Sequence, residues 1–138
     1  MRLVRCAAAA AALVLLGVSL SVAEPVGQDD KTVQSVSAPI LDNILDGMKS
    51  NDYAKYSKDC DDTFKESMTE EVFVKATAQL KANLGDCLEK QYLGFLTKGQ
   101  MTMVLWKAKY SQADEDVLIK VVISKRSDKF MVTGLWFE

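Results

Sequence analysis

The chain has 138 residues, of which 49% are hydrophobic and 26% are charged, and it contains no histidine. The absence of histidine excludes serine–histidine–aspartate and cysteine–histidine catalysis, histidine zinc sites and haem ligation by imidazole. The formal net charge of −2 gives no support for binding to nucleic acid or to an anionic membrane, since both need a clustered positive face.

The first 23 residues predict an export signal. Arg2 and Arg5 precede an apolar run over 6–20, and the small residues Ser21-Val22-Ala23 follow it. The run is about fifteen residues long, shorter than the roughly twenty that cross a bilayer. We expect cleavage before Glu24 and an exported protein, periplasmic or secreted. Cys6 stands at the start of the apolar run and not after it, so it does not indicate a lipoprotein.

The rest of the chain predicts one domain without membrane insertion. Residues 24–36 are polar and lack a sustained period, so we expect a flexible N-terminus there and a folded domain over 37–138. No later segment is long and apolar enough to span a bilayer.

Two cysteines, Cys60 and Cys87, remain after cleavage of the signal. In an oxidising compartment they predict a structural disulfide, which would stabilise the fold by roughly 3–4 kcal/mol on the chain-entropy model. The alternatives are two separate buried thiols or a redox pair, although the close C-x-x-C spacing of a redox pair is absent.

Apolar residues recur at helical spacing in three segments. The first helix is expected from Ser37, its cap, to about residue 50, with Pro39 in its first turn. The second is expected over about 52–65, and the third begins after Thr69 and ends at Gly85.

After Gly85 the apolar period changes from helical spacing to alternation. Four extended runs, over 87–96, 101–110, 117–125 and 130–137, are joined by short polar links, which predicts an antiparallel meander. Val117, Ile119, Val121 and Ile123 share one face, expected to lie under the helices. The fold class is therefore α+β, with three N-terminal helices packed on a four-stranded antiparallel sheet.

Acidic clusters occur at Asp59, Asp61 and Asp62 and again at 114–116. Neither has the alternating ligands and glycine of a calcium loop, so we predict no metal site. The glycine-rich nucleotide-binding motifs are absent too, and we predict no cofactor.

Three stretches carry a resemblance to a known superfamily: Gly47-x-x-x-Asn51-Asp52-Tyr53-x-x-Tyr56-Ser57, then 107–110 (Lys-Ala-Lys-Tyr), then 134–137 (Gly-Leu-Trp-Phe). Over residues 37–138 the chain resembles small bacterial and archaeal domains of unknown function in the nuclear transport factor 2-like superfamily, which has a cystatin-like α+β cone. The resemblance implies an opening between the concave sheet and the helices. It also implies that the protein could dimerise through a face of its sheet, as members of that superfamily often do. Enzymes of that superfamily usually carry His, or Asp with Tyr, in the pocket, and no catalytic residue is carried over here.

We expect a non-enzymatic binding or interaction module whose partner is an unknown small molecule or protein, with a homodimer through the sheet as a further possibility. The candidate pocket residues are aromatic: Tyr53, Tyr56, Trp106, Tyr110 and Trp136. One alternative is that both tryptophans belong to the core. Another is a histidine-free isomerase or dehydratase that uses a buried carboxylate beside a tyrosine.

Overall fold

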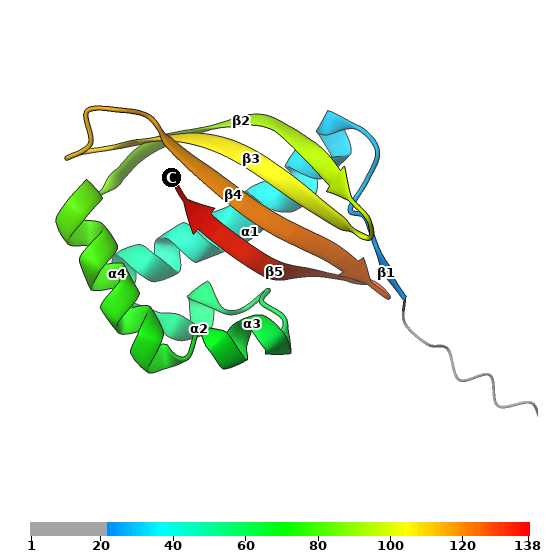
Figure 1. Ribbon diagram of the computed structural model, residues 1–138, viewed down its shortest axis with the longest axis horizontal. Helices are drawn as coiled ribbons and strands as arrows, with labels where there is room; N and C mark the ends of the chain where they lie inside the picture. The colour runs from blue at the N-terminus through cyan, green and yellow to red at the C-terminus, as the bar shows by residue number, and fades with distance from the viewer. Residues whose placement is uncertain (1–21) are drawn as a thin grey trace, which may run out of the picture.

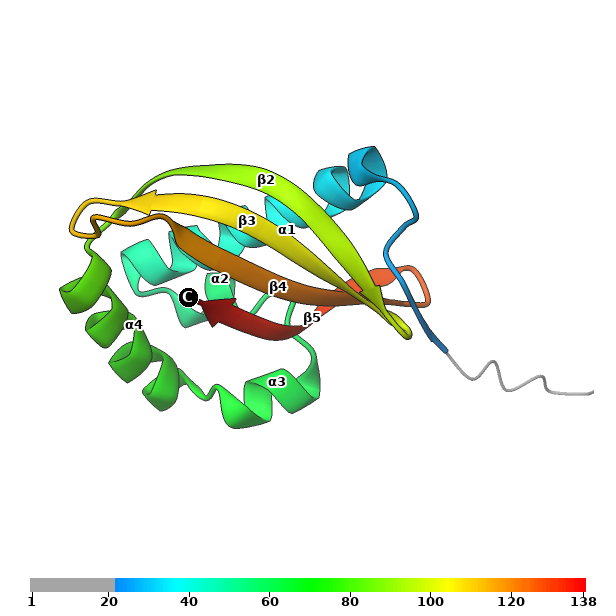
Figure 2. The same cartoon turned by 45° about the horizontal axis from the view of Figure 1, so that its top comes forward.

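The computed structural model describes residues 22–138, in which a curled antiparallel sheet wraps around helices (Figures 1 and 2). The helices are α1 (Asp30–Ser50), α2 (Tyr53–Tyr56), α3 (Asp62–Ser67) and α4 (Glu70–Leu84), and the strands are β1 (Ala23–Glu24), β2 (Cys87–Lys98), β3 (Met101–Tyr110), β4 (Val117–Arg126) and β5 (Lys129–Phe137). The predicted α+β class is confirmed, but the prediction of three helices and a four-stranded sheet is corrected to four helices and five strands in the described residues. Most of the predicted signal peptide lies outside them.

The predicted meander is confirmed, because β2, β3, β4 and β5 pair antiparallel in that order. The fifth strand, β1, pairs with β4 through Ala23 opposite Arg126. Just after β1, the backbone N–H of Val26 donates to Thr102 Oγ1 at 2.9 Å, and the Val26 side chain is buried. These contacts hold part of the segment that was expected to be flexible.

Helix α1 begins at Asp30 rather than at Ser37, so the structure differs from the expectation for residues 24–36. The Asp29 carboxylate caps the helix by accepting from the Thr32 N–H at 2.8 Å, and this hydrogen bond lowers the pKa of Asp29. Ser37 is buried in the helix interior. Pro39 lies exposed in mid-helix, and Ser35, whose carbonyl loses its helical N–H partner, is exposed as well.

The helix expected over 52–65 is divided into α2 and α3 because the segment between them bonds to the sheet. Cys60 forms a parallel bridge with Val132 of β5, and Val132 exchanges backbone hydrogen bonds with Asp59 and Asp61 at 2.7 and 3.0 Å. Backbone groups used in this way cannot continue a helical ladder. Asp61 then starts α3 by accepting from the Phe64 N–H at 2.8 Å.

Helix α4 starts at the predicted Thr69 cap, whose hydroxyl accepts from the Val72 N–H at 3.4 Å. Of its 15 residues only Phe73 and Thr77 are buried. The helix therefore lies on the surface, and its C-terminal end is tied to the turn after β3, where the Gln112 N–H donates to the Leu84 carbonyl at 2.9 Å.

The core lies between α1 and the concave face of the sheet. Ile119, Val121 and Ile123 of β4 are fully buried there, together with Leu41 and Ile44 of α1, as the alternation predicted for β4. No helix within residues 22–138 has the length and apolar content needed to cross a membrane.

Candidate functional site

The five candidate aromatic residues do not share one pocket. Tyr53 and Tyr56 lie in α2, where their rings pack against Phe73 of α4 with centroids 5.5 and 4.6 Å away. Tyr56 is buried, and the Tyr53 hydroxyl donates to the Met68 carbonyl at 2.8 Å. These two tyrosines join the helices to one another.

The two tryptophans lie on opposite faces of the sheet. Trp106 is buried on the concave face, where its ring meets Tyr92 edge-on with centroids 5.4 Å apart. Trp136 is 48% exposed on the outer face and lies over Gly134, with the Lys120 ammonium 6.0 Å from its ring centroid. Trp106 fills the space beneath the sheet, in line with the alternative that it belongs to the core.

Tyr110 is the candidate that lines a cavity. This cavity, of about 220 Å³, lies between α1, α4 and the start of β2. Its apolar lining consists of Leu45, Met48, Leu80, Cys87, Leu88 and Tyr110.

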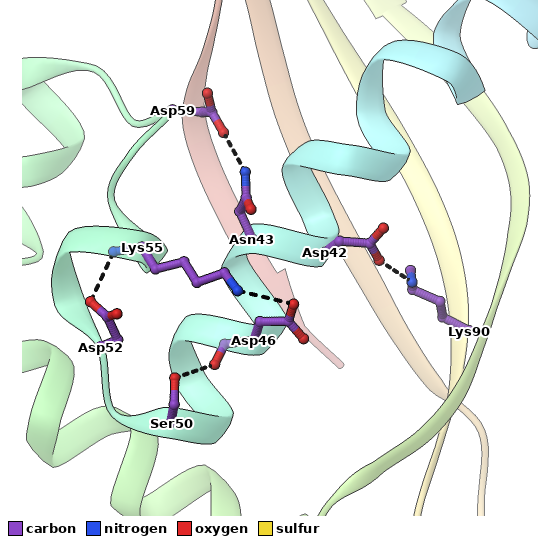
Figure 3. A network of polar contacts seen from close by, with 8 residues as sticks. All are labelled: Asp42, Asn43, Asp46, Ser50, Asp52, Lys55, Asp59 and Lys90. Carbon is purple, nitrogen blue, oxygen red and sulfur yellow. Dashed lines mark hydrogen bonds and ion pairs between the residues drawn. The ribbon is translucent and has the colours of Figure 1, made fainter.

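The rim of the cavity is charged, and its aspartates are ion-paired. Asp42 and Asp46, one turn apart on α1, bind Lys90 of β2 and Lys55 of α2 (Figure 3). These ion pairs tie α1 to both neighbours. The remaining charged groups of the lining are Lys49, Lys81, Asp86 and Glu89.

The floor of the cavity is uncharged at neutral pH. Burial raises the pKa of the Tyr110 hydroxyl, and the neighbouring Cys87 thiol raises it further. Burial likewise raises the pKa of Cys87, an effect opposed by Lys90 and by a hydrogen bond with Tyr110. An apolar floor below a ring of charges suits a small amphipathic molecule.

The predicted disulfide between Cys60 and Cys87 is wrong, since both thiols are free. Cys60 lies beside β5 and Cys87 opens β2, with β3 and β4 between those strands. Strands spaced by about 4.8 Å put such positions well beyond the roughly 7 Å Cα separation that a disulfide spans. The compartment expected for the chain says nothing about where the fold places each thiol.

The two thiols should react at very different rates. Burial, and to a smaller extent the charge of the nearby Asp59, raises the pKa of the buried Cys60 to about 12. Cys87 is only half-buried, at the cavity, so reagents can reach it more easily. Because the thiolate is the nucleophile, we expect iodoacetamide at pH 8 to label Cys87 slowly, faster as the pH rises, and to leave Cys60 unlabelled. Peptide mass spectrometry measures this, with urea-unfolded protein as the control in which both react. An untreated chain lighter by two hydrogens would contradict the free thiols.

A second, more open groove lies between the first half of α1, residues 58–62 and the start of β5. Its charged lining is partly paired, with Lys65 3.5 Å from Asp62 and Asn43 donating to Asp59. No three metal-ligating side chains of residues 22–138 lie close enough together to hold an ion.

Sequence reasoning missed the residues of the cavity other than Tyr110. Leu45 and Met48 belong to the apolar stripe of α1, but they are only half-buried while Leu41 and Ile44 face the core. The available signal was the width of the apolar stripe of α1, which is greater than the one side of the helix that faces the core. The placement of α4 beside α1 and β2, which brings Leu80 to the cavity, has no counterpart in the apolar periodicity.

The comparisons with known proteins identify a family. A family described as "Protein of unknown function (DUF3887)" matches residues 42–127, more than half of the chain. The chain belongs to the DUF3887 family. No curated protein and no solved structure matches it. The DUF3887 segment runs from the middle of α1 to the turn after β4, so it includes α4, β2 and most of the cavity lining.

Within the DUF3887 segment, the motif from Gly47 to Tyr56 builds the corner between α1 and α2. Asn51, in the left-handed conformation with φ of 55°, ends α1, and Asp52 caps α2. A Cβ on Gly47 would lie 2.6 Å from the Tyr56 backbone nitrogen, so glycine is required there. The motif therefore has a structural role in this chain.

Proposed function

We propose that this DUF3887 protein is an exported, non-enzymatic module that binds a small amphipathic molecule in the cavity between α1, α4 and β2. The observation that supports the proposal is the cavity of about 220 Å³, with Tyr110 on its uncharged floor and ion-paired aspartates at its rim. The volume is below the roughly 300 Å³ of the smallest drug-sized pockets, so the ligand is a small one.

The arrangement of carboxylates favours binding over catalysis. Asp61 is the buried carboxylate of the described chain, and it is held by Arg126 at 3.1 Å while it caps α3. The Tyr92 hydroxyl donates a hydrogen bond to the Asp30 carboxylate at 2.8 Å, but this pair is exposed and lies outside the cavity. The histidine-free isomerase or dehydratase would need such a pair inside an apolar pocket.

We also propose that the fold is a variant of the nuclear transport factor 2-like cone. The order of the elements, with helices first and an antiparallel meander after them, supports this relationship. So does the position of α1 within the concavity of the curled sheet (Figure 2). A high-resolution crystal structure superposed on members of that superfamily would test it.

The binding proposal is tested with matched tryptophan substitutions on α4. Leu80 lines the cavity, whereas Val74 on the same helix is 42% exposed and does not. We expect at least one of three probes, indole, cyclohexylamine or cyclohexanecarboxylate, to give saturation-transfer NMR signals with the wild type and with Val74→Trp, but not with Leu80→Trp, whose indole fills the cavity. Equal signals from both variants, or no signal from any probe with the wild type, would contradict the proposal.

A further inference from the structure

Strand β2 is the unpaired edge of the sheet. It contains 12 residues, none of them buried, and within residues 22–138 no segment pairs with the side that faces away from β3. The opposite edge is treated differently, because the bridge from Cys60 covers β5 at Val132. An uncovered edge presents rows of free N–H and C=O groups that can accept another strand.

Exposed leucines are concentrated on this edge. Leu88, Leu93 and Leu96 are 67%, 51% and 46% exposed, and Met101 at the start of β3 is 40% exposed. Burying side chains of this size against a neighbouring strand lowers the free energy of the complex. The edge therefore offers both backbone hydrogen bonds and apolar area to a partner.

A β-bulge gives β2 an internal symmetry. Tyr92 pairs with Trp106, and Gly94 pairs with the adjacent Leu105. Leu93 therefore has no partner of its own on β3 and is the bulged residue. Because of this extra residue, Tyr92 and Phe95 both lie opposite buried, concave-face residues although they are three positions apart. In a regular strand, residues three apart face opposite sides.

We propose that β2 pairs antiparallel with β2 of a second copy, about a two-fold axis at the bulge. With the axis between Leu93 and Gly94, Tyr92 lies opposite Phe95 of the second copy on the concave side. A side chain on Gly94 would meet no atom within 4 Å, so the chain at the axis is open to close approach.

Charges at both ends of the strand select this register. Glu89 pairs with Lys109 and Lys98 with Met101, which places both on the outer face of the sheet. In the proposed register Glu89 lies opposite Lys98 of the second copy, and the symmetry makes this pair twice. An unrelated extended peptide would gain backbone bonds but not this repeated charge match, so the occupant is a second copy.

The register is tested by reversing charges and restoring them. For the full-length chain we expect sedimentation equilibrium to give twice the mass of one chain. Glu89→Lys and Lys98→Glu should each raise the dimer dissociation constant at least about tenfold, because like charges then face each other twice. The double variant, Glu89→Lys with Lys98→Glu, should restore the dimer. Lys129→Glu, an exposed charge on the opposite edge strand, is the matched control and should change nothing.

Three results would overturn the proposal. The first is a wild type that remains monomeric at millimolar concentration. The second is a double variant that dissociates as readily as the single variants while its unfolding transition matches the wild type. The third is a dimer that both single reversals leave intact and Trp136→Glu abolishes, because that dimer would use the outer sheet face. Glu89 also belongs to the cavity lining, so the dimer is measured without any ligand, and the saturation-transfer test uses the wild type and the α4 variants. The two proposals therefore fail separately.

Discussion

Replacing Gly47 with alanine should lower the free energy of unfolding by about 2–3 kcal/mol, even though alanine is the better helix former. The added Cβ would lie 2.6 Å from the Tyr56 nitrogen, 2.8 Å from its Cα and 2.9 Å from the Asp52 carbonyl oxygen. These atoms belong to backbone, so α1 and α2 would have to separate. Urea denaturation followed by circular dichroism measures the change.

The control for Gly47 is Gln34→Ala, an exposed position on the same helix. That substitution should change the free energy of unfolding by no more than about 0.5 kcal/mol. If Gly47→Ala instead stabilised the protein, as it would at an open helical position, the close approach of the two helices would be refuted.

Removing the Asp61 side chain should cost about 2 kcal/mol of stability, from the lost helix cap and the lost half-exposed ion pair. This carboxylate is buried, accepts a hydrogen bond from the Phe64 N–H and binds the Arg126 guanidinium at 3.1 Å. Asp61→Ala removes the cap of α3 and the ion pair together, whereas Asp61→Asn keeps an oxygen that can cap the helix. We expect the asparagine variant to lie between alanine and wild type in thermal unfolding.

The neighbouring Asp62 provides a matched control for Asp61. Its side chain is 96% exposed and pairs with Lys65 at 3.5 Å, so Asp62→Ala should cost less than about 1 kcal/mol. Equal losses from Asp61→Ala and Asp62→Ala would show that the position of Asp61 between α3 and β5 adds nothing.

The four strands of the meander, β2 to β5, were predictable because each is bounded by short polar links and pairs with its neighbour in the chain, whereas β1, which pairs with β4, was missed. The limits of β3 were predicted at both ends, over 101–110, and β2, β4 and β5 differ by one or two residues. Helix α4 was predictable for a similar reason, since its cap and its glycine stop are local signals.

The errors arose where distant segments meet. The break between α2 and α3 depends on hydrogen bonds to Val132. The start of α1 depends on a cap at Asp29, which lies before the part of the helix with the clearest apolar periodicity. The prediction of a disulfide was wrong because it was based on an oxidising compartment, which carries no information about the distance between Cys60 and Cys87. Of the candidate pocket residues, Tyr110 alone lines the cavity, because a pocket depends on how α1, α4 and β2 are placed relative to one another and not on the count of aromatic residues.

The hydrogen bond from Val26 to Thr102 joins positions 76 residues apart, and the bridge from Cys60 to Val132 joins the helical half to the last strand. The chain must close these long loops before either contact contributes, and loop closure costs entropy that is recovered only late. We therefore expect folding in milliseconds to seconds rather than microseconds. The β2–β3 and β4–β5 hairpins, whose turns are the shortest links of the meander, should form first, and the N-terminal strand should dock among the last elements to become ordered.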